Sequence, residues 1–300
     1  MRRPWPLRSG DRVAVVAPSG SFDRTSFDAG LAVLAQRYRP VFIAGIFETE
    51  RYLAGSDARR LAELTSALSD RNVRGIFCAR GGYGAMRLLP QLSFDALVPK
   101  PLVGFSDITA LHLALHSAGW VTFHGPVVTQ LGRQSQDTVA RLFQLLEVSE
   151  PAPPLQGATT LVAGQVEGPL LGGNLSVLTR LIGTPYFPSL KGAVLLLEDV
   201  GERPYRLDRM WTHLRLAGVF QQVVGIALGD FTTCVEKDAG YTSGDVLRSL
   251  AEETRLPCAS GFPIGHGDTN TAVPLGPRVR LDATRGTLEF LEAATAAADP

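Results

Sequence analysis

A serine, a carboxylate and a histidine occupy positions from which side chains can carry out nucleophilic catalysis. Ser106 ends the apolar run 101–105 and is followed by Asp107 and by apolar residues at helical spacing. A strand-turn-helix corner of this kind exposes a hydroxyl, as a nucleophile requires. The alternative is that Ser106 or Asp107 simply caps the helix that follows.

Glu198 comes where the apolar run 194–197 ends, and His266 stands between two glycines in a predicted loop. Taken singly, Glu198 suits a solvated acid or a helix cap, and His266 suits an exposed turn. Together with Ser106 they supply the nucleophile, base and orienting acid of a serine hydrolase. The α/β-hydrolases share this order, but Ile108 replaces the second glycine of their G-x-S-x-G elbow, which disfavours that fold.

The glycine-rich segment 80–84, Arg-Gly-Gly-Tyr-Gly, follows a predicted strand at 74–79. Glycines let backbone amides approach an anion closely. The segment lacks G-x-G-x-x-G and the Lys-Ser/Thr ending of a phosphate loop. Two interpretations remain open: a tight turn, or an oxyanion hole formed by the amides of Gly82 and Asp107.

The remaining histidines favour packing roles. His112 and His116 have the i, i+4 spacing of a zinc motif, but Leu113 stands where that motif has glutamate, so we expect no metal site. His124 is a candidate to line the cleft, and His213 is expected to pack within a helix.

Composition describes an ordinary globular chain of 300 residues, 45% hydrophobic, which is long enough for two domains. Lysine plus arginine number 29 and aspartate plus glutamate number 29, so no charge excess favours nucleic acid or a membrane surface. The three cysteines are far apart in apolar runs and are typical of a reducing compartment. We find no signal peptide or membrane span and expect a cytoplasmic protein.

Apolar runs alternate with amphipathic stretches through the first half, which predicts an N-terminal three-layer α/β domain with a mainly parallel sheet. Ligands of such sheets gather at the carboxyl ends of the strands, where Ser106 and the glycine-rich segment fall. The predicted strands are 12–17, 41–46, 74–79, 102–105 and 121–123, with helices at 22–37 and 57–68.

A proline-rich stretch near residue 150 predicts a domain boundary. We expect an N-terminal domain over 1–150, a linker over 151–165 and a smaller β-rich mixed domain over 166–300. In the second domain we expect a helix after Gly172-Gly173-Asn174, strands at 193–197 and 223–228, and a helix at 205–216.

Several motifs in one order extend through nearly the whole chain, and together they resemble the LD-carboxypeptidases. These are the murein tetrapeptide carboxypeptidase family of serine peptidases, whose relatives include microcin C immunity peptidases. The motifs are 16–20 (VAPSG), 52–55 (YLAG), 80–84 (RGGYG), 104–109 (GFSDIT), 172–175 (GGNL), 197–210 (LEDVGERPYRLDRM), 228–231 (LGDF) and 265–267 (GHG).

This resemblance implies that Ser106 is the nucleophile, His266 the base and Glu198 its orienting carboxylate, with Gly82 and Asp107 donating to the oxyanion. It implies an active site between the two domains, a homodimer, and no metal or organic cofactor. The activity implied is hydrolysis of an L,D-peptide bond that releases terminal D-alanine from peptidoglycan tetrapeptides during cell-wall recycling. A carboxypeptidase must also recognise a terminal carboxylate, for which Arg80, Arg203 or Arg206 are the candidate partners, with Asn174 as a further polar contact to the substrate.

Two alternatives remain. The chain suits an immunity-type peptidase that cleaves an aminoacyl-nucleotide peptide, which aromatic residues placed for base stacking would favour. It also suits a non-catalytic two-domain protein in which the glycine-rich segment holds a small anionic ligand and Ser106 caps a helix.

Overall fold

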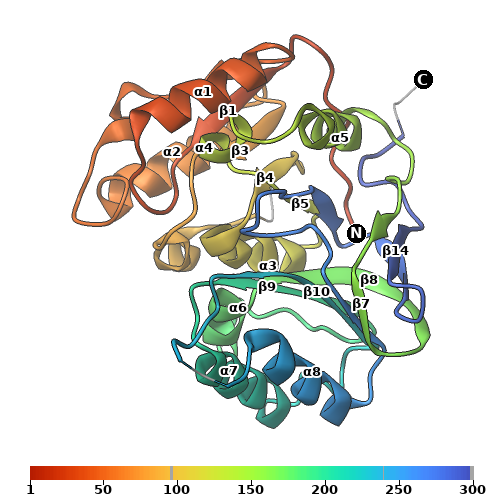
Figure 1. Cartoon of the computed structure of the whole chain (residues 1–300). Coiled ribbons are helices and arrows are strands. Elements are labelled where there is room, and N and C mark those ends of the chain that lie inside the picture. The colour runs from red at the N-terminus through yellow and green to blue at the C-terminus, as the bar shows by residue number, and fades with distance from the viewer. Residues whose placement is uncertain (95–96, 239, 298–300) are drawn as a thin grey trace.

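The computed structural model describes residues 1–94, 97–238 and 240–297. Two β-sheets with packed helices make up the molecule, and the N-terminal half lies above the C-terminal half in Figure 1. No helix in these ranges combines the length and apolar content needed to cross a bilayer. A few residues of each predicted domain, 1–150 and 166–300, therefore lie outside the residues that the structure describes.

The first sheet has the strand order β12-β5-β4-β3-β1-β2, and its pairings are parallel except for β12 with β5. Its central strands are apolar and buried, as a sheet covered on both faces requires. The mainly parallel N-terminal sheet is therefore confirmed. The strands are β1 (Arg12–Val16), β2 (Arg39–Val41), β3 (Gly75–Cys78), β4 (Leu102–Gly104), β5 (Thr122–His124) and β12 (Val273–Leu275).

Several helices of this half begin at side-chain caps. The Asp23 carboxylate accepts from the amides of Thr25 and Ser26, and the Ser56 hydroxyl accepts from the amide of Arg59. The helices are α1 (Arg24–Ala35), α2 (Asp57–Ser69), α3 (Thr109–Ser117), α4 (Val128–Leu131) and α5 (Gln136–Glu147), with 3-10 helices η1 (Ala44–Phe47), η2 (Ala85–Arg87), η3 (Leu89–Gln91) and η4 (Ser106–Ile108).

The predicted strand at 41–46 is wrong. The edge strand β2 ends at Val41, and η1 follows. Ile46 still reaches the core, but from the 3-10 helix, while Phe42 and Ile43 are exposed. An apolar run at a sheet edge can bury single side chains without continuing the strand.

The second sheet has the order β6-β14-β13-β8-β9-β10-β11-β7 and mixes parallel and antiparallel pairs. Figure 1 shows α6, α7 and α8 below it. The elements are β6 (Leu155–Gln156), β7 (Thr159–Val162), β8 (Gln165–Asn174), β9 (Val194–Val200), β10 (Gly225–Thr232), β11 (Cys258–Ser260), β13 (Arg278–Asp282), β14 (Thr287–Phe290), α6 (Leu175–Leu181), α7 (Pro204–Leu216) and α8 (Ser243–Thr254).

Two strands lie within the predicted linker 151–165. β6 pairs with β14 and β7 pairs with β11, so both belong to the second sheet. In the opposite direction, β12 of the C-terminal segment pairs with β5 of the first sheet. The division into two domains stays a prediction. The pairing of β12 with β5 joins strands on opposite sides of the predicted boundary.

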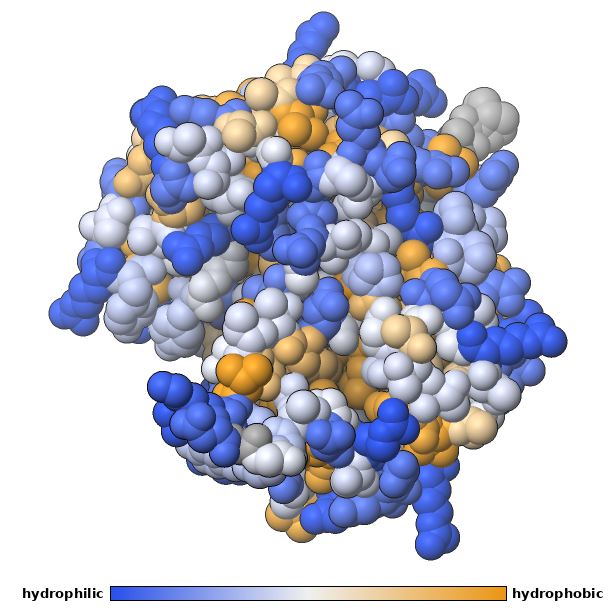
Figure 2. All heavy atoms as spheres, in the orientation of Figure 1, coloured by the Kyte–Doolittle hydropathy of each residue, from blue (hydrophilic) through white to orange (hydrophobic). Residues whose placement is uncertain are grey.

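One hydrophobic cluster joins the two halves. It contains Ile76 of β3, Leu111 of α3, Leu195 of β9 and Trp211 of α7, all buried. In Figure 2, hydrophilic side chains project around the outline of the visible face, and apolar side chains appear in patches between them. Because both sheets pack into the same cluster, side chains from the two sheets keep a defined relation to each other.

Candidate active site

The backbone at Ser106 has the geometry of a nucleophile turn. β4 ends at Gly104, Phe105 is extended, and Ser106, the first residue of η4, takes a φ of +62°. This left-handed conformation is costly for a residue with a side chain and is concentrated at functional sites. It is also the corner expected from the sequence, with Ser106 partly exposed and its neighbours on both sides buried.

The glycine-rich loop passes in contact with the serine. A Cβ built at Gly81 would lie 2.8 Å from Ser106 Cβ and 3.0 Å from its Oγ, so a side chain at this position would displace the nucleophile. Gly82 has a φ of +104°, and its amide has no hydrogen-bond acceptor among the described residues. A free amide beside the nucleophile is the requirement for an oxyanion donor.

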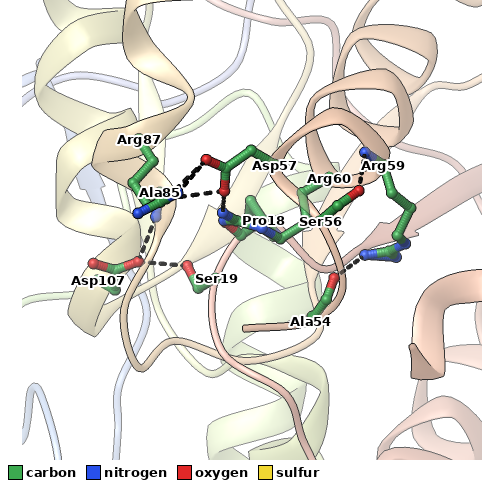
Figure 3. Close-up of polar contacts among 10 residues, drawn as sticks. All are labelled: Pro18, Ser19, Ala54, Ser56, Asp57, Arg59, Arg60, Ala85, Arg87 and Asp107. Atoms are coloured by element: carbon green, nitrogen blue, oxygen red, sulfur yellow. Dashed lines mark hydrogen bonds and ion pairs between the residues drawn. The ribbon is translucent and has the colours of Figure 1, made fainter. Parts of the chain in front are cut away.

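The Asp107 carboxylate ties the serine turn to the glycine-rich loop (Figure 3). Its Oδ2 accepts from Ser19 Oγ at 2.6 Å and from the Ala85 amide at 2.8 Å. Asp107 is 1% exposed, and this burial raises the pKa of its carboxyl. Three segments far apart in sequence are therefore joined at one oxygen.

A buried cation supports these loops from behind (Figure 3). The Arg60 guanidinium is fully buried and donates to the Pro18 carbonyl and to the Asp57 carboxylate. Arg87 donates to both oxygens of Asp57, which lowers the pKa of that carboxyl. A Cβ at Gly84 would lie 2.6 Å from the Arg60 Nη1, so glycine is needed where the loop crosses the arginine.

Glu198 and His266 meet directly. His266 Nδ1 lies 2.6 Å from Glu198 Oε2, and the Glu198 side chain is completely buried in β9. Gly265 brings the histidine loop this close, because a Cβ there would lie 2.7 Å from Glu198 Oε2. The Phe105 ring packs on His266 with ring centroids 4.6 Å apart. The imidazole is thus held between the carboxylate and the serine turn.

Ser106 and His266 line the same cavity, which has a volume of about 590 Å³. Among the described residues no hydrogen bond joins their side chains; such contacts are often long without substrate and shorten when it binds. The cavity is lined by Phe22, Asp23, Ser26, Arg80, Gly81, Gly82, Phe105, Ser106, Val127, Thr129, Gln130, Arg133, Val200 and His266.

The four residues suggested for carboxylate binding are placed differently. Arg80 lines the cavity and donates to the Ser21 carbonyl. Asn174 is buried: its side chain caps α6 and donates to Asp199 at 3.0 Å. Arg203 faces Glu236 and Arg206 faces Glu202, and neither is part of the described lining.

Sequence reasoning missed Arg133, which lines the cavity from the segment between α4 and α5. Its side chain is exposed and forms no ion pair or hydrogen bond with any described residue. An isolated arginine in a loop is not part of any sequence motif that would identify it as a binding residue. The only available signal was its position just after the short helix α4, which follows β5.

Among residues 1–94, 97–238 and 240–297, no group of three or more His, Cys, Asp or Glu side chains is arranged to hold a metal. His112 instead contacts the Gly104 carbonyl through Nε2 at 2.8 Å. His124 is fully buried and is not among the described residues that line the cavity.

Family models and sequence relatives of this chain come from one family of peptidases. A family model for the LD-carboxypeptidase N-terminal domain matches residues 13–125, and one for the LD-carboxypeptidase C-terminal domain matches residues 167–281. A murein tetrapeptide carboxypeptidase of Pseudomonas aeruginosa is 34% identical over 294 residues, covering 91% of this chain and 94% of the relative.

Solved structures are similar over almost the whole chain. A muramoyltetrapeptide carboxypeptidase from Oxalobacter formigenes has a TM-score of 0.83 at 29% identity, covering 93% of this chain and 97% of that one. A microcin C7 self-immunity protein has a TM-score of 0.88 at 22% identity, covering 99% and 100%. The second likeness, at this low identity, shows a shared fold alone.

Proposed function

The chain belongs to the LD-carboxypeptidase family, and on that premise we propose that it is a serine carboxypeptidase that hydrolyses an L,D-peptide bond. Its substrates are peptidoglycan-derived tetrapeptides, from which it releases the terminal D-alanine. The observation that carries the proposal is the contact of His266 with buried Glu198 on the wall of the cavity that also contains Ser106. A protein that only bound ligands would not require this arrangement.

The mechanism is acyl transfer through a Ser106 ester. His266 Nε2 removes the hydroxyl proton while Oγ attacks the scissile carbonyl, and the electron pair moves to the carbonyl oxygen. The amides of Gly82 and Asp107 donate to this oxyanion. As the C–N bond breaks, His266 passes its proton to the leaving amine of D-alanine.

Hydrolysis of the ester repeats the same steps with water as the nucleophile. His266 removes a proton from water, and the second oxyanion collapses with return of the proton to Ser106 Oγ. Glu198 keeps the proton of the neutral imidazole on Nδ1 and stabilises the imidazolium formed in each half-reaction.

Substrate orientation requires a cation for the terminal carboxylate. Arg80 and Arg133 are the two arginines of the described cavity lining. The guanidinium of Arg80 already contacts the Ser21 carbonyl, so Arg133 is the freer donor for a bidentate carboxylate contact. Peptide substrates with a free C-terminus fit this arrangement.

The direct test is mass spectrometry of products from a set of muropeptide tetrapeptides and aminoacyl-nucleotide peptides. Loss of one alanine from the tetrapeptides alone is expected. Cleavage of the aminoacyl-nucleotide peptides alone would replace this function with the immunity-type activity. Cleavage of neither set, with Ser106 unreactive toward a fluorophosphonate, would support the ligand-binding alternative.

We also propose that the enzyme is a cytoplasmic homodimer. Its cysteines Cys78, Cys234 and Cys258 are free and buried, which suits a reducing compartment. Light scattering and cell fractionation test the two statements separately.

A further inference from the structure

His124 lies behind the catalytic carboxylate, at the junction of the two sheets. It is the last residue of β5 and pairs with Gly104 of β4 on one side and Val273 of β12 on the other. Its exposed fraction is 0%, and its ring packs edge-on against Phe105, next to the nucleophile. The strand register therefore fixes the imidazole close to Ser106 without bringing it into the cavity.

Three polar atoms meet there without partners. His124 Nδ1, His124 Nε2 and Glu198 Oε1 are buried and have no hydrogen bond to any described residue. His124 Nε2 is 4.0 Å from Glu198 Oε1, while the other carboxylate oxygen contacts His266. Leaving one oxygen of a buried carboxylate unsatisfied is costly, so a donor aimed at it has a clear physical purpose.

We propose that His124 is a positioning residue for Glu198, with its Nε2–H directed at Glu198 Oε1. The carboxylate is then held between two imidazoles, His266 on one oxygen and His124 on the other. Shortening the present separation by about 1 Å gives ordinary hydrogen-bond length. This inference rests on the serine mechanism proposed above, because His124 acts only through Glu198 and makes no contact with substrate.

The electrostatic setting keeps His124 neutral. Burial lowers its pKa well below the ordinary value, and the neighbouring imidazoles of His112 and His266 act in the same direction. A neutral imidazole has one N–H donor and one acceptor nitrogen. Two further acids lie near this carboxylate: burial raises the pKa of Asp199 and of Asp230, and the charge of Glu198 acts in the same direction on both.

Three substitutions separate a positioning role from simple packing. His124→Gln keeps an N–H near the place of Nε2, His124→Asn places one near Nδ1, and His124→Phe keeps the ring volume without a donor. Thr122→Val is the matched control, since Thr122 lies two residues away on the same face of β5 and has a buried, unpartnered hydroxyl. Folded fraction is measured for every variant.

We expect His124→Phe and His124→Asn to lower kcat by about tenfold to a hundredfold at unchanged KM, as losing a hydrogen bond to a charged group does. His124→Gln should recover most of this loss, and Thr122→Val should match wild type. The pH–rate profile of His124→Phe should differ from that of wild type, because the Glu198 carboxylate loses a donor that a purely packing residue would not supply.

Acylation of Ser106 by a fluorophosphonate provides a second readout that does not depend on substrate identity. If no tetrapeptide is cleaved but His124→Phe still slows acylation and His124→Gln restores it, the positioning role stands and only the substrate assignment fails. The proposal is overturned if the folded His124→Phe enzyme keeps kcat and the acylation rate within twofold of wild type and has the same pH–rate profile.

Discussion

His266 Nδ1 lies 2.6 Å from Glu198 Oε2, although the two residues are 68 positions apart and come from β9 and from the loop between β11 and β12. In the proposed mechanism this contact holds the imidazole proton on Nδ1 and leaves Nε2 to accept the serine proton. The proposed base and its carboxylate therefore both lie in the C-terminal half, whereas Ser106 belongs to the N-terminal half.

Glu198→Gln should lower kcat by roughly 10³- to 10⁴-fold with little change in KM, because an amide neither stabilises imidazolium nor fixes the tautomer. Steady-state kinetics on the tetrapeptide measure this effect, and thermal melting controls for folding. A rate within tenfold of wild type in a folded variant would remove Glu198 from the catalytic group.

Ser106→Ala should reduce turnover by several orders of magnitude while the fold is retained, because the hydroxyl contributes little packing. Ser106→Gly should be equally inactive but more stable than Ser106→Ala by about 1 kcal/mol, because glycine adopts a positive φ without steric cost. Urea denaturation compares the two. Equal stability would show that the serine turn stores no strain, and activity above a tenth of wild type in either would exclude Ser106 as nucleophile.

Periodicity predicted the parallel sheet because β1, β3 and β4 are buried on both faces and so read as continuous apolar runs. It failed at 41–46, where the same apolar signal belongs to an edge segment that turns into a 3-10 helix. It also gave no sign of β6 and β7. Short edge strands depend on neighbours distant in sequence, here β14 and β11.

Of the candidate site, residue type and position were enough to suggest Ser106, Glu198 and His266, since each interrupts or follows an apolar run. The convergence of two of them at 2.6 Å required the tertiary structure. Asn174 was predicted as a further polar contact for the substrate, and the structure shows its side chain capping α6 and donating to Asp199. Sequence cannot distinguish a capping amide from a binding one.

Asp107→Asn should slow acylation by about tenfold or more with intact binding of product, because a neutral amide oxygen is a weaker acceptor for Ser19 Oγ and the Ala85 amide than a carboxylate oxygen. The link between the glycine-rich loop and the serine turn is then weaker. The Ser19→Ala and Asp107→Asn effects should be non-additive in a double-mutant cycle of acylation rates. Additive effects would show that the two side chains act separately.

Arg133→Gln should raise KM about tenfold at unchanged kcat for a peptide with a free C-terminus, because a lost ground-state contact weakens binding alone. The same peptide with a C-terminal amide is the control and should be equally poor with both enzymes. A KM equal to wild type for the free acid would leave Arg80 as the carboxylate partner.

His112 should make folding stability depend on pH between 6.5 and about 4. Burial lowers its pKa from 6.5 to about 4, so the folded protein keeps the ring neutral while the unfolded chain takes up a proton below pH 6.5. The contribution of His112 to the free energy of unfolding is therefore fully present above pH 6.5. It decreases by up to about 3 kcal/mol as the pH falls from 6.5 to about 4.

The variant His112→Gln isolates this effect, because glutamine does not titrate and keeps a donor for the Gly104 carbonyl that His112 Nε2 contacts at 2.8 Å. Asp199, whose pKa burial raises to about 6, contributes in the opposite direction, but equally in both proteins. Urea denaturation at steps from pH 7 to pH 4 should show wild type losing more stability than His112→Gln. Parallel stability curves would contradict this prediction. They would mean that His112 takes up a proton equally in the folded and unfolded chain, despite its burial against Gly104 of β4.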